Sequence, residues 1–156
     1  MKRIGFLHEQ IVSEENCRLA IINAAKHKKK RRNVQKVMDN LDFYAKDLSE
    51  RLVRLDFTSP YRTRIIKDGL SGKERELQIP AFYPDQCAHH AIVQVLQPLI
   101  MKSSYYWSCA NIPNRGIDRA AKGVERATMR DIKHAKYCVK MDIHKFYPSI
   151  PHDKLK

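Results

Sequence analysis

Apolar positions recur every three or four residues over long parts of the chain, a spacing that predicts amphipathic helices. One helix is expected over residues 13–26, where Ser13 can cap the amino end and acidic residues occupy the first turn. A longer helix is expected over about residues 34–56, and Pro60 interrupts the pattern after it. Its apolar stripe consists of Val34, Val37, Met38, Leu41, Ala45, Leu48, Leu52 and Leu55.

Two further helices are expected in the second half of the chain. Pro84 can occupy the first position of one of them, and Pro98 ends or kinks it. Its apolar positions are Ala88, Ala91, Ile92, Val95 and Leu96. A polar and aromatic loop over residues 103–115 leads through Gly116 into the last helix. The apolar positions of that helix are Ile117, Ala120, Ala121, Val124, Ala127 and Ile132.

Residues 62–66 and 76–79 are predicted to form two strands of a hairpin, because a turn sequence with two glycines separates them. The tip and flanks of this hairpin are basic and contain Arg62, Arg64, Lys67, Lys73 and Arg75. A basic hairpin can close over a triphosphate or a template strand. An ordinary exposed hairpin, made basic for solubility, has the same pattern.

Residues 137–143 alternate between apolar and polar positions, which predicts another strand. Tyr137, Val139 and Met141 would share one face, and Asp142 would leave the opposite face. A carboxylate held on a rigid strand is suited to binding a hard metal ion in a phosphoryl-transfer site.

The charge balance favours an anionic partner. Among 156 residues, 30 Lys and Arg oppose 17 Asp and Glu, which gives a net charge of +13. Nucleic acid is the first expectation, and a basic domain without such a role is the alternative. No apolar run approaches the ~20 residues that span a bilayer, so no membrane partner is expected. The four widely spaced cysteines indicate reduced thiols and a cytoplasmic protein.

The densest charge lies in residues 26–32. Like charges repel one another unless an anion is near, so this run is either a solvated loop or a contact for the phosphates of a nucleic acid. The candidate contact residues are Lys28, Lys29, Lys30, Arg31 and Arg32.

Four segments, in order along the chain, resemble the N-terminal part of bacterial reverse transcriptases, the enzymes of retrons, group II introns and diversity-generating retroelements. Residues 67–80 resemble the fingers hairpin, and residues 84–91 resemble the helix after it. Residues 113–120 resemble the next block, and residues 139–150 resemble the first catalytic motif of the palm. The resemblance is weak before about residue 60. Gln86 stands where the family usually has arginine.

The resemblance implies roles in a two-metal nucleotidyl transfer. Asp142 would bind both Mg²⁺ ions, with help from the backbone carbonyl of Ile143. Tyr147 would be the steric gate under the sugar of the incoming nucleotide. Phe146 would pack beneath the palm next to it, as part of the nucleotide-binding site.

The fingers residues have implied roles as well. Lys67 and Arg75 resemble the residues that grip the triphosphate, for which a guanidinium fork is well suited. Arg115 and Gly116 would lie near the template or the nucleotide pocket.

The implied fold is α+β, with a mostly helical fingers subdomain, a basic β-hairpin and the first strand of a right-hand palm. Its expected parts are a basic helical segment over residues 1–60, a fingers-like region over 61–136 and the start of the palm over 137–156. The implied function is that of an RNA-directed DNA polymerase, whose partners are an RNA template, a primer and a dNTP.

The family's second catalytic motif, an aromatic-x-Asp-Asp hairpin, has no counterpart here, because the sequence contains no Asp-Asp pair. A single carboxylate cannot hold two Mg²⁺ ions. We therefore expect a truncated chain that does not polymerise alone, and whose exposed apolar surface favours self-association. Two alternatives are a catalytically inactive RNA-binding remnant and a basic helical domain with a fortuitous motif. The number and order of the matches disfavour the second.

Overall fold

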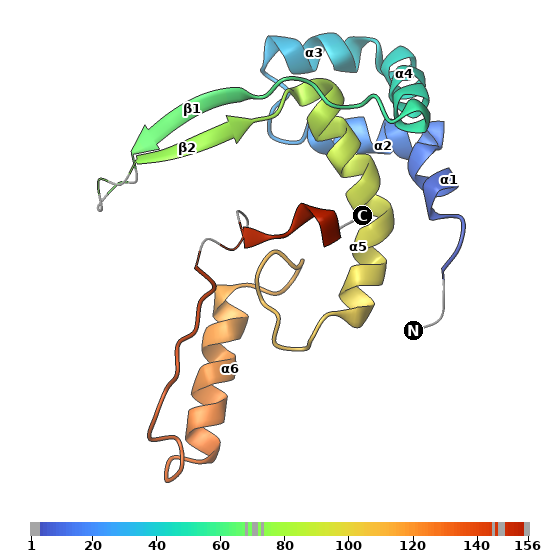
Figure 1. Ribbon diagram of the computed structural model, residues 1–156. Helices are drawn as coiled ribbons and strands as arrows, with labels where there is room; N and C mark the ends of the chain where they lie inside the picture. Colours follow the sequence, from blue (N-terminus) through green and yellow to red (C-terminus); the bar gives the residue numbers. More distant parts are fainter. Residues whose placement is uncertain are drawn as a thin grey trace. The chain divides into compact units, whose positions relative to one another are not determined.

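The computed structural model describes residues 4–67, 69, 72, 74–144, 146 and 149–154, and the chain forms two compact units, Met1–Ser104 and Tyr105–Lys156. The first unit contains α1 (Leu7–Val12), α2 (Glu14–Ala24), α3 (Arg32–Asp39), α4 (Leu41–Arg54), β1 (Arg62–Lys67), β2 (Glu74–Ile79), the helical turn η1 (Phe82–Gln86) and α5 (Cys87–Ser103). The second contains α6 (Ile117–Arg130) and the short turn η3 (His152–Lys154) (Figure 1). The α+β composition is as expected.

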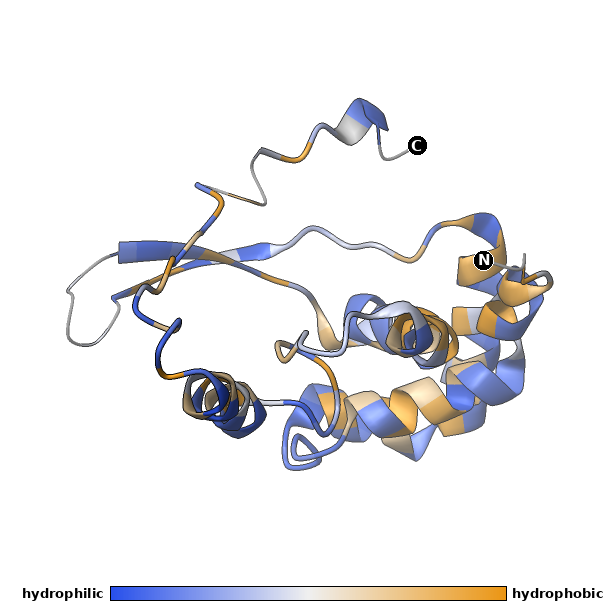
Figure 2. Ribbon diagram, turned by 90° about the horizontal axis from the view of Figure 1, so that it is seen from below, coloured by the Kyte–Doolittle hydropathy of each residue, from blue (hydrophilic) through white to orange (hydrophobic). Residues whose placement is uncertain are grey.

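The hydrophobic core of the first unit forms around α2, which packs against both α4 and α5. The buried residues of α2 are three or four positions apart and so share one face: Cys17, Ala20, Ile21 and Ala24. Leu48 from α4 and two alanines from α5 are buried in the same cluster. Figure 2 shows that these helices carry both hydrophobic and hydrophilic residues, as amphipathic packing requires.

Polar side chains hold α2 against α5. Asn16 Nδ2 donates to the Ala91 carbonyl at 3.0 Å, and Gln94 Nε2 donates to Asn16 Oδ1 at 2.9 Å. Asn23 Nδ2 donates to Gln94 Oε1 at 2.6 Å. The amino end of α2 is capped as predicted, since Ser13 Oγ accepts from the Asn16 amide at 3.3 Å. These bonds fix the position of α5, and with it Ala91, the last residue of the segment that resembles the reverse-transcriptase helix.

The single helix expected over residues 34–56 is wrong, because α3 and α4 are separate helices. Asn40 lies between them with φ −126° and ψ 44°, outside the helical region. Its Nδ2 lies 3.5 Å from the Lys36 carbonyl, a local side-chain contact of the kind that competes with helix formation. Val37 before the break and Leu48 after it are both buried. The apolar spacing therefore continues across a change of direction that it cannot reveal.

The predicted hairpin is confirmed. β1 and β2 pair antiparallel, from Arg62 opposite Ile79 to Lys67 opposite Glu74. β2 begins two residues earlier than expected, because the ladder extends to Glu74. All of β2 is exposed, and only Ile66 of β1 is partly covered. The hairpin thus projects from the helices of the first unit (Figure 1).

A buried carboxylate joins the segment before the hairpin to the segment after it. Asp85, in η1, is 1% exposed, and it accepts hydrogen bonds from the Ser59 amide at 2.9 Å and from the Ser59 hydroxyl. α5 then continues past Pro98 to Ser103, so this proline does not end the helix. Among the described residues, no helix has both the length and the apolar character to cross a membrane.

The strand expected over residues 137–143 is wrong in the described structure. This segment has no regular secondary structure, and its apolar row is open to solvent, with Tyr137 93% and Met141 87% exposed. An isolated extended segment leaves its backbone donors and acceptors without a partner, so a strand forms only beside another strand. No described residue pairs with it. The described part of the chain accordingly contains no palm sheet.

Candidate nucleic-acid interface

Three arginines lie on one face of the hairpin. Side chains alternate between the two faces of a strand, so Arg62 and Arg64 of β1 share a face. Arg75 lies on this face too, because it is the partner of Ile66. The arginines line up from the base of the hairpin toward its turn, as a contact with a chain of phosphates would require.

Lys67 lies on the other face, opposite Glu74. Its Nζ is 3.4 Å from Glu74 Oε1, and both side chains are largely exposed. The structure therefore places the two residues expected to grip a triphosphate, Lys67 and Arg75, on opposite faces of the hairpin. Lys73, the remaining hairpin candidate, lies outside the described residues.

The basic run forms the connection between α2 and α3, and one of its residues is held by the start of the next motif. Lys28 is half-buried, and its Nζ donates to Gln86 Oε1 at 2.7 Å. Gln86 Nε2 donates in turn to the Pro80 carbonyl at 3.1 Å. Gln86 therefore orients a cation at the place where the resembled family usually has an arginine of its own.

A groove of about 680 Å³ lies in the first unit where the hairpin meets the helices, and we name it the hairpin-base groove. Its cations are Lys28, Arg31, Lys36 and Arg62. Its apolar lining includes Val34, Val37 and Phe82. Lys29, Lys30 and Arg32 are exposed and do not line it. The run therefore divides into residues that face a concave surface and residues that face open solvent. Lys36 was not among the candidates from the sequence, because its place in the groove depends on how α3 packs.

One wall of the hairpin-base groove is fixed by a hydrogen-bond network. The rings of Tyr44 and Tyr83 meet edge to face at 4.8 Å, and the Tyr83 hydroxyl donates to Asp47. Arg51 Nε is 2.7 Å from the same Asp47 carboxylate. Burial acts to raise the pKa of Asp47, but the hydrogen bonds from Tyr83 and Arg51 outweigh it and hold that pKa below its usual value. Burial and the bond to Asp47 raise the pKa of Tyr83, so the ring remains a neutral donor.

A second groove, of about 630 Å³, lies within the second unit, and we name it the α6 groove. Its cations occupy one face of the helix and its start, at spacings of four, three and four residues: Arg115, Arg119, Lys122 and Arg126. Gly116 and one carboxylate, Asp118, line it as well. The spacing of the cations is the signal in the sequence that could have extended the prediction beyond Arg115 and Gly116.

Aromatic side chains complete the α6 groove. The Arg119 guanidinium lies 4.5 Å from the centre of the Tyr106 ring, and its Nη2 donates to the Tyr106 carbonyl at 3.3 Å. Trp107 meets Tyr106 edge to face at 4.9 Å. A Cβ at Gly123 would overlap the Trp107 indole, with Cε3 at 2.9 Å, so a larger residue at this position would displace the ring. Proteins that bind single-stranded nucleic acids combine cations with aromatic faces in this way.

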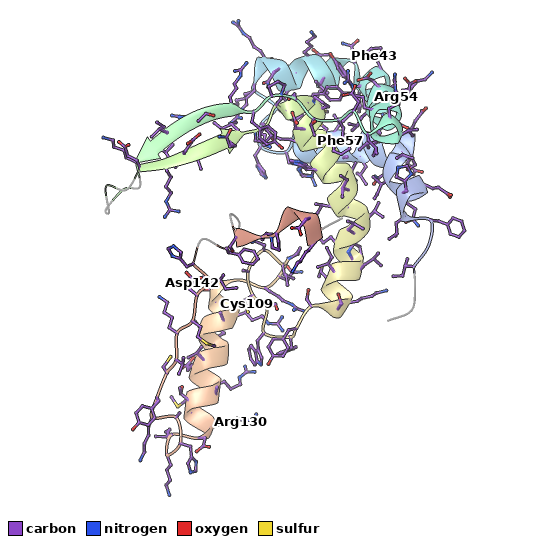
Figure 3. All side chains as sticks on the ribbon, in the orientation of Figure 1. Phe43, Arg54, Phe57, Cys109, Arg130 and Asp142 are labelled. Carbon is purple, nitrogen blue, oxygen red and sulfur yellow. The ribbon has the colours of Figure 1, made fainter. Side chains whose placement is uncertain are left out.

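The expected metal site is not assembled by the described residues. Asp142 is exposed on the segment after α6 (Figure 3), and its Oδ1 accepts from the Ile143 amide at 3.0 Å. No three acidic, histidine or cysteine side chains of the described part come together as a metal-binding group. One carboxylate and one carbonyl supply too few of the oxygen ligands that Mg²⁺ requires. Phe146 is 48% exposed, and Tyr147 lies outside the described residues.

No protein-family model matches this chain, and no curated protein sequence is significantly similar to it.

Proposed function

We propose that this chain is the fingers region and first palm segment of an RNA-directed DNA polymerase of the bacterial reverse-transcriptase type. In this role it binds an RNA template with its primer and the incoming dNTP. The observation that carries the proposal is the exposed hairpin with Arg62, Arg64 and Arg75 on one face. The hairpin overlaps residues 67–80, the segment that resembles the fingers hairpin, and the other three segments follow in the same order.

The charge of the described residues supports a nucleic-acid partner. Both grooves are lined by cations, and the aromatic residues of the α6 groove offer stacking surfaces to bases. Of the proposed magnesium site, this chain supplies only the Asp142 carboxylate and the Ile143 carbonyl. The other ligands would belong to an Asp-Asp motif that is not in this sequence. We assign no catalytic step to these residues alone.

Primer extension tests whether this chain lacks polymerase activity on its own. The purified 156-residue chain should extend no primer on an RNA template with Mg²⁺, because it lacks the second pair of carboxylates. Robust extension that Asp142→Ala abolishes would contradict the proposal.

The second candidate function, an inactive RNA-binding remnant, is favoured by the incomplete metal site. The gene beyond codon 156 separates the two functions. An in-frame aromatic-x-Asp-Asp motif supports the polymerase, and an immediate stop codon supports the remnant. Both require RNA binding, so a chain that does not bind RNA satisfies neither.

A further inference from the structure

The cations of the hairpin-base groove come from three separate parts of the first unit. Lys28 and Arg31 come from the α2–α3 connection, Lys36 comes from α3, and Arg62 is the first residue of β1. No carboxylate is among the described residues that line the groove. Four positive charges brought together by folding repel one another, and a bound anion would relieve that repulsion.

Other cations of the same unit have acidic partners. Arg18 pairs with Asp42, Arg51 with Asp47, and Arg54 with Glu50. Within the described residues, none of the four groove cations forms an ion pair of this kind. Lys29, Lys30 and Lys46 are also without an ion pair among the described residues, so the groove is distinguished by the four cations that it brings to one concave surface.

Lys28 is held in place for binding. Its ammonium group has three N–H donors, and the bond at 2.7 Å to Gln86 Oε1 occupies one of them. Gln86 Nε2 is itself hydrogen-bonded to the Pro80 carbonyl. The position of the Lys28 ammonium group is therefore set by the backbone between β2 and η1. A neutral acceptor leaves the full positive charge of Lys28 available to an anion.

The apolar part of the lining argues for a ligand larger than an inorganic ion. The accessible apolar lining includes Ile79, which is 38% exposed, the exposed Pro60, and the half-buried rings of Tyr44 and Tyr83. A nucleotide strand offers both chemistries, a phosphate for the cations and a sugar and base edge for the apolar surface. The basic face of the hairpin begins at Arg62 in the groove and continues to Arg64, so the positive surface extends beyond one anion.

We propose that the hairpin-base groove binds a backbone phosphate of a single RNA strand through Lys28, Arg31, Lys36 and Arg62. The identity of the ligand rests on the proposed function, whereas the location of the site rests on the groove itself. The strand leaves the groove along the basic face of the hairpin. Lys29, Lys30 and Arg32 contribute only the diffuse attraction of exposed charges.

The basic run provides a matched comparison. Lys28→Gln with Arg31→Gln removes two groove charges, and Lys29→Gln with Lys30→Gln removes two charges of the same run outside the groove. Affinity for a fluorescein-labelled oligouridylate is measured by anisotropy over a range of salt concentrations. The groove pair should weaken binding roughly tenfold and reduce the magnitude of the salt slope by up to about 0.7, the contribution of one phosphate contact of a single strand. The outer pair should change affinity by less than about threefold.

Equal losses in the two pairs, or no loss in the groove pair, would overturn the groove assignment. If circular dichroism shows that the groove pair does not fold, the single variant Lys36→Gln is used instead. Its control is Lys46→Gln, because both side chains are exposed and only Lys36 lines the groove. Lys36→Gln should weaken binding at least twice as much as Lys46→Gln, and equal effects contradict the assignment.

Two further outcomes separate the ligand from the site. A polyglutamate peptide that competes as well as RNA, and does so only with the intact groove, would show that the site takes acidic proteins and would refute the RNA assignment. Failure of the unaltered chain to bind RNA would refute the proposed function, whereas RNA binding indifferent to the groove refutes this inference alone.

Discussion

Lys28 Nζ lies 2.7 Å from Gln86 Oε1, so a lysine from the α2–α3 connection reaches the first turn before α5. In the resembled reverse transcriptases that position usually carries an arginine. The contact places a cation beside the uncharged glutamine. It would keep the local charge unchanged if the chain is of the reverse-transcriptase type that we propose.

Gln86→Arg should destabilise the chain by roughly 1 kcal/mol, because it replaces the acceptor of Lys28 with a second cation. Lys28→Gln combined with Gln86→Arg should recover most of that loss and retain RNA affinity. Urea unfolding and RNA anisotropy measure the two effects. Gln10→Arg, at an exposed position on α1, is the control and should change stability by less than about 0.5 kcal/mol. A double variant that is less stable, or binds RNA less tightly, than either single variant would contradict the exchange of charge between the two positions.

The Asp47 network predicts a dependence of stability on pH. The pKa of Asp47 is lowered in the folded chain, so the stability it contributes is present above its unfolded pKa, near 3.9, and is lost as pH falls through its folded pKa. Asp47→Asn should therefore reduce the free energy of unfolding at neutral pH and flatten its decline below about pH 4. Exposed Asp39→Asn is the control, and an identical acid profile for both variants would count against the network.

Gly123→Ala tests the packing of the α6 groove. An added Cβ would overlap the Trp107 indole, and Trp107 is the only tryptophan of the chain. Its fluorescence emission should therefore shift to longer wavelength as the ring is displaced toward solvent. Gly116→Ala, which adds a methyl group where no atom lies within 4 Å, should leave the emission unchanged. An unchanged spectrum for Gly123→Ala would mean that the indole does not rest on α6.

Ser59→Ala tests the connection between the segment before the hairpin and η1. It removes the hydroxyl donor to the buried Asp85 carboxylate and should cost about 1–3 kcal/mol in unfolding free energy. Exposed Ser103→Ala, whose hydroxyl bonds only to the preceding turn of α5, is the control and should cost less than about 0.5 kcal/mol. Equal losses would show that the Asp85 contact does not stabilise the unit.

Local signals in the sequence predicted the local structure well. The Ser13 cap, the helical spacing of α2 and the hairpin were predicted because neighbouring residues determine them. The break at Asn40 was missed because an apolar stripe reports burial and not backbone angles. The strand at residues 137–143 was predicted from alternation, which indicates a pleat but supplies no partner.

The candidate interface was predicted only in part for the same reason. Lys28, Arg31 and Arg62 were candidates by composition, but their convergence with Lys36 depends on tertiary packing. Arg119 follows Arg115 at helical spacing, and its position over Tyr106 depends on a loop that no periodicity describes. The roles assigned to Asp142 and Tyr147 stay predictions from the resemblance.

The salt dependence of RNA binding by the 156-residue chain tests the central claim most directly. If the basic hairpin and the grooves grip the backbone, log K should fall linearly with log salt, with a slope of about −3 or steeper, equivalent to four or more phosphate contacts. A flat dependence, or no binding at low salt, would contradict the account of this chain as the nucleic-acid-binding part of a polymerase.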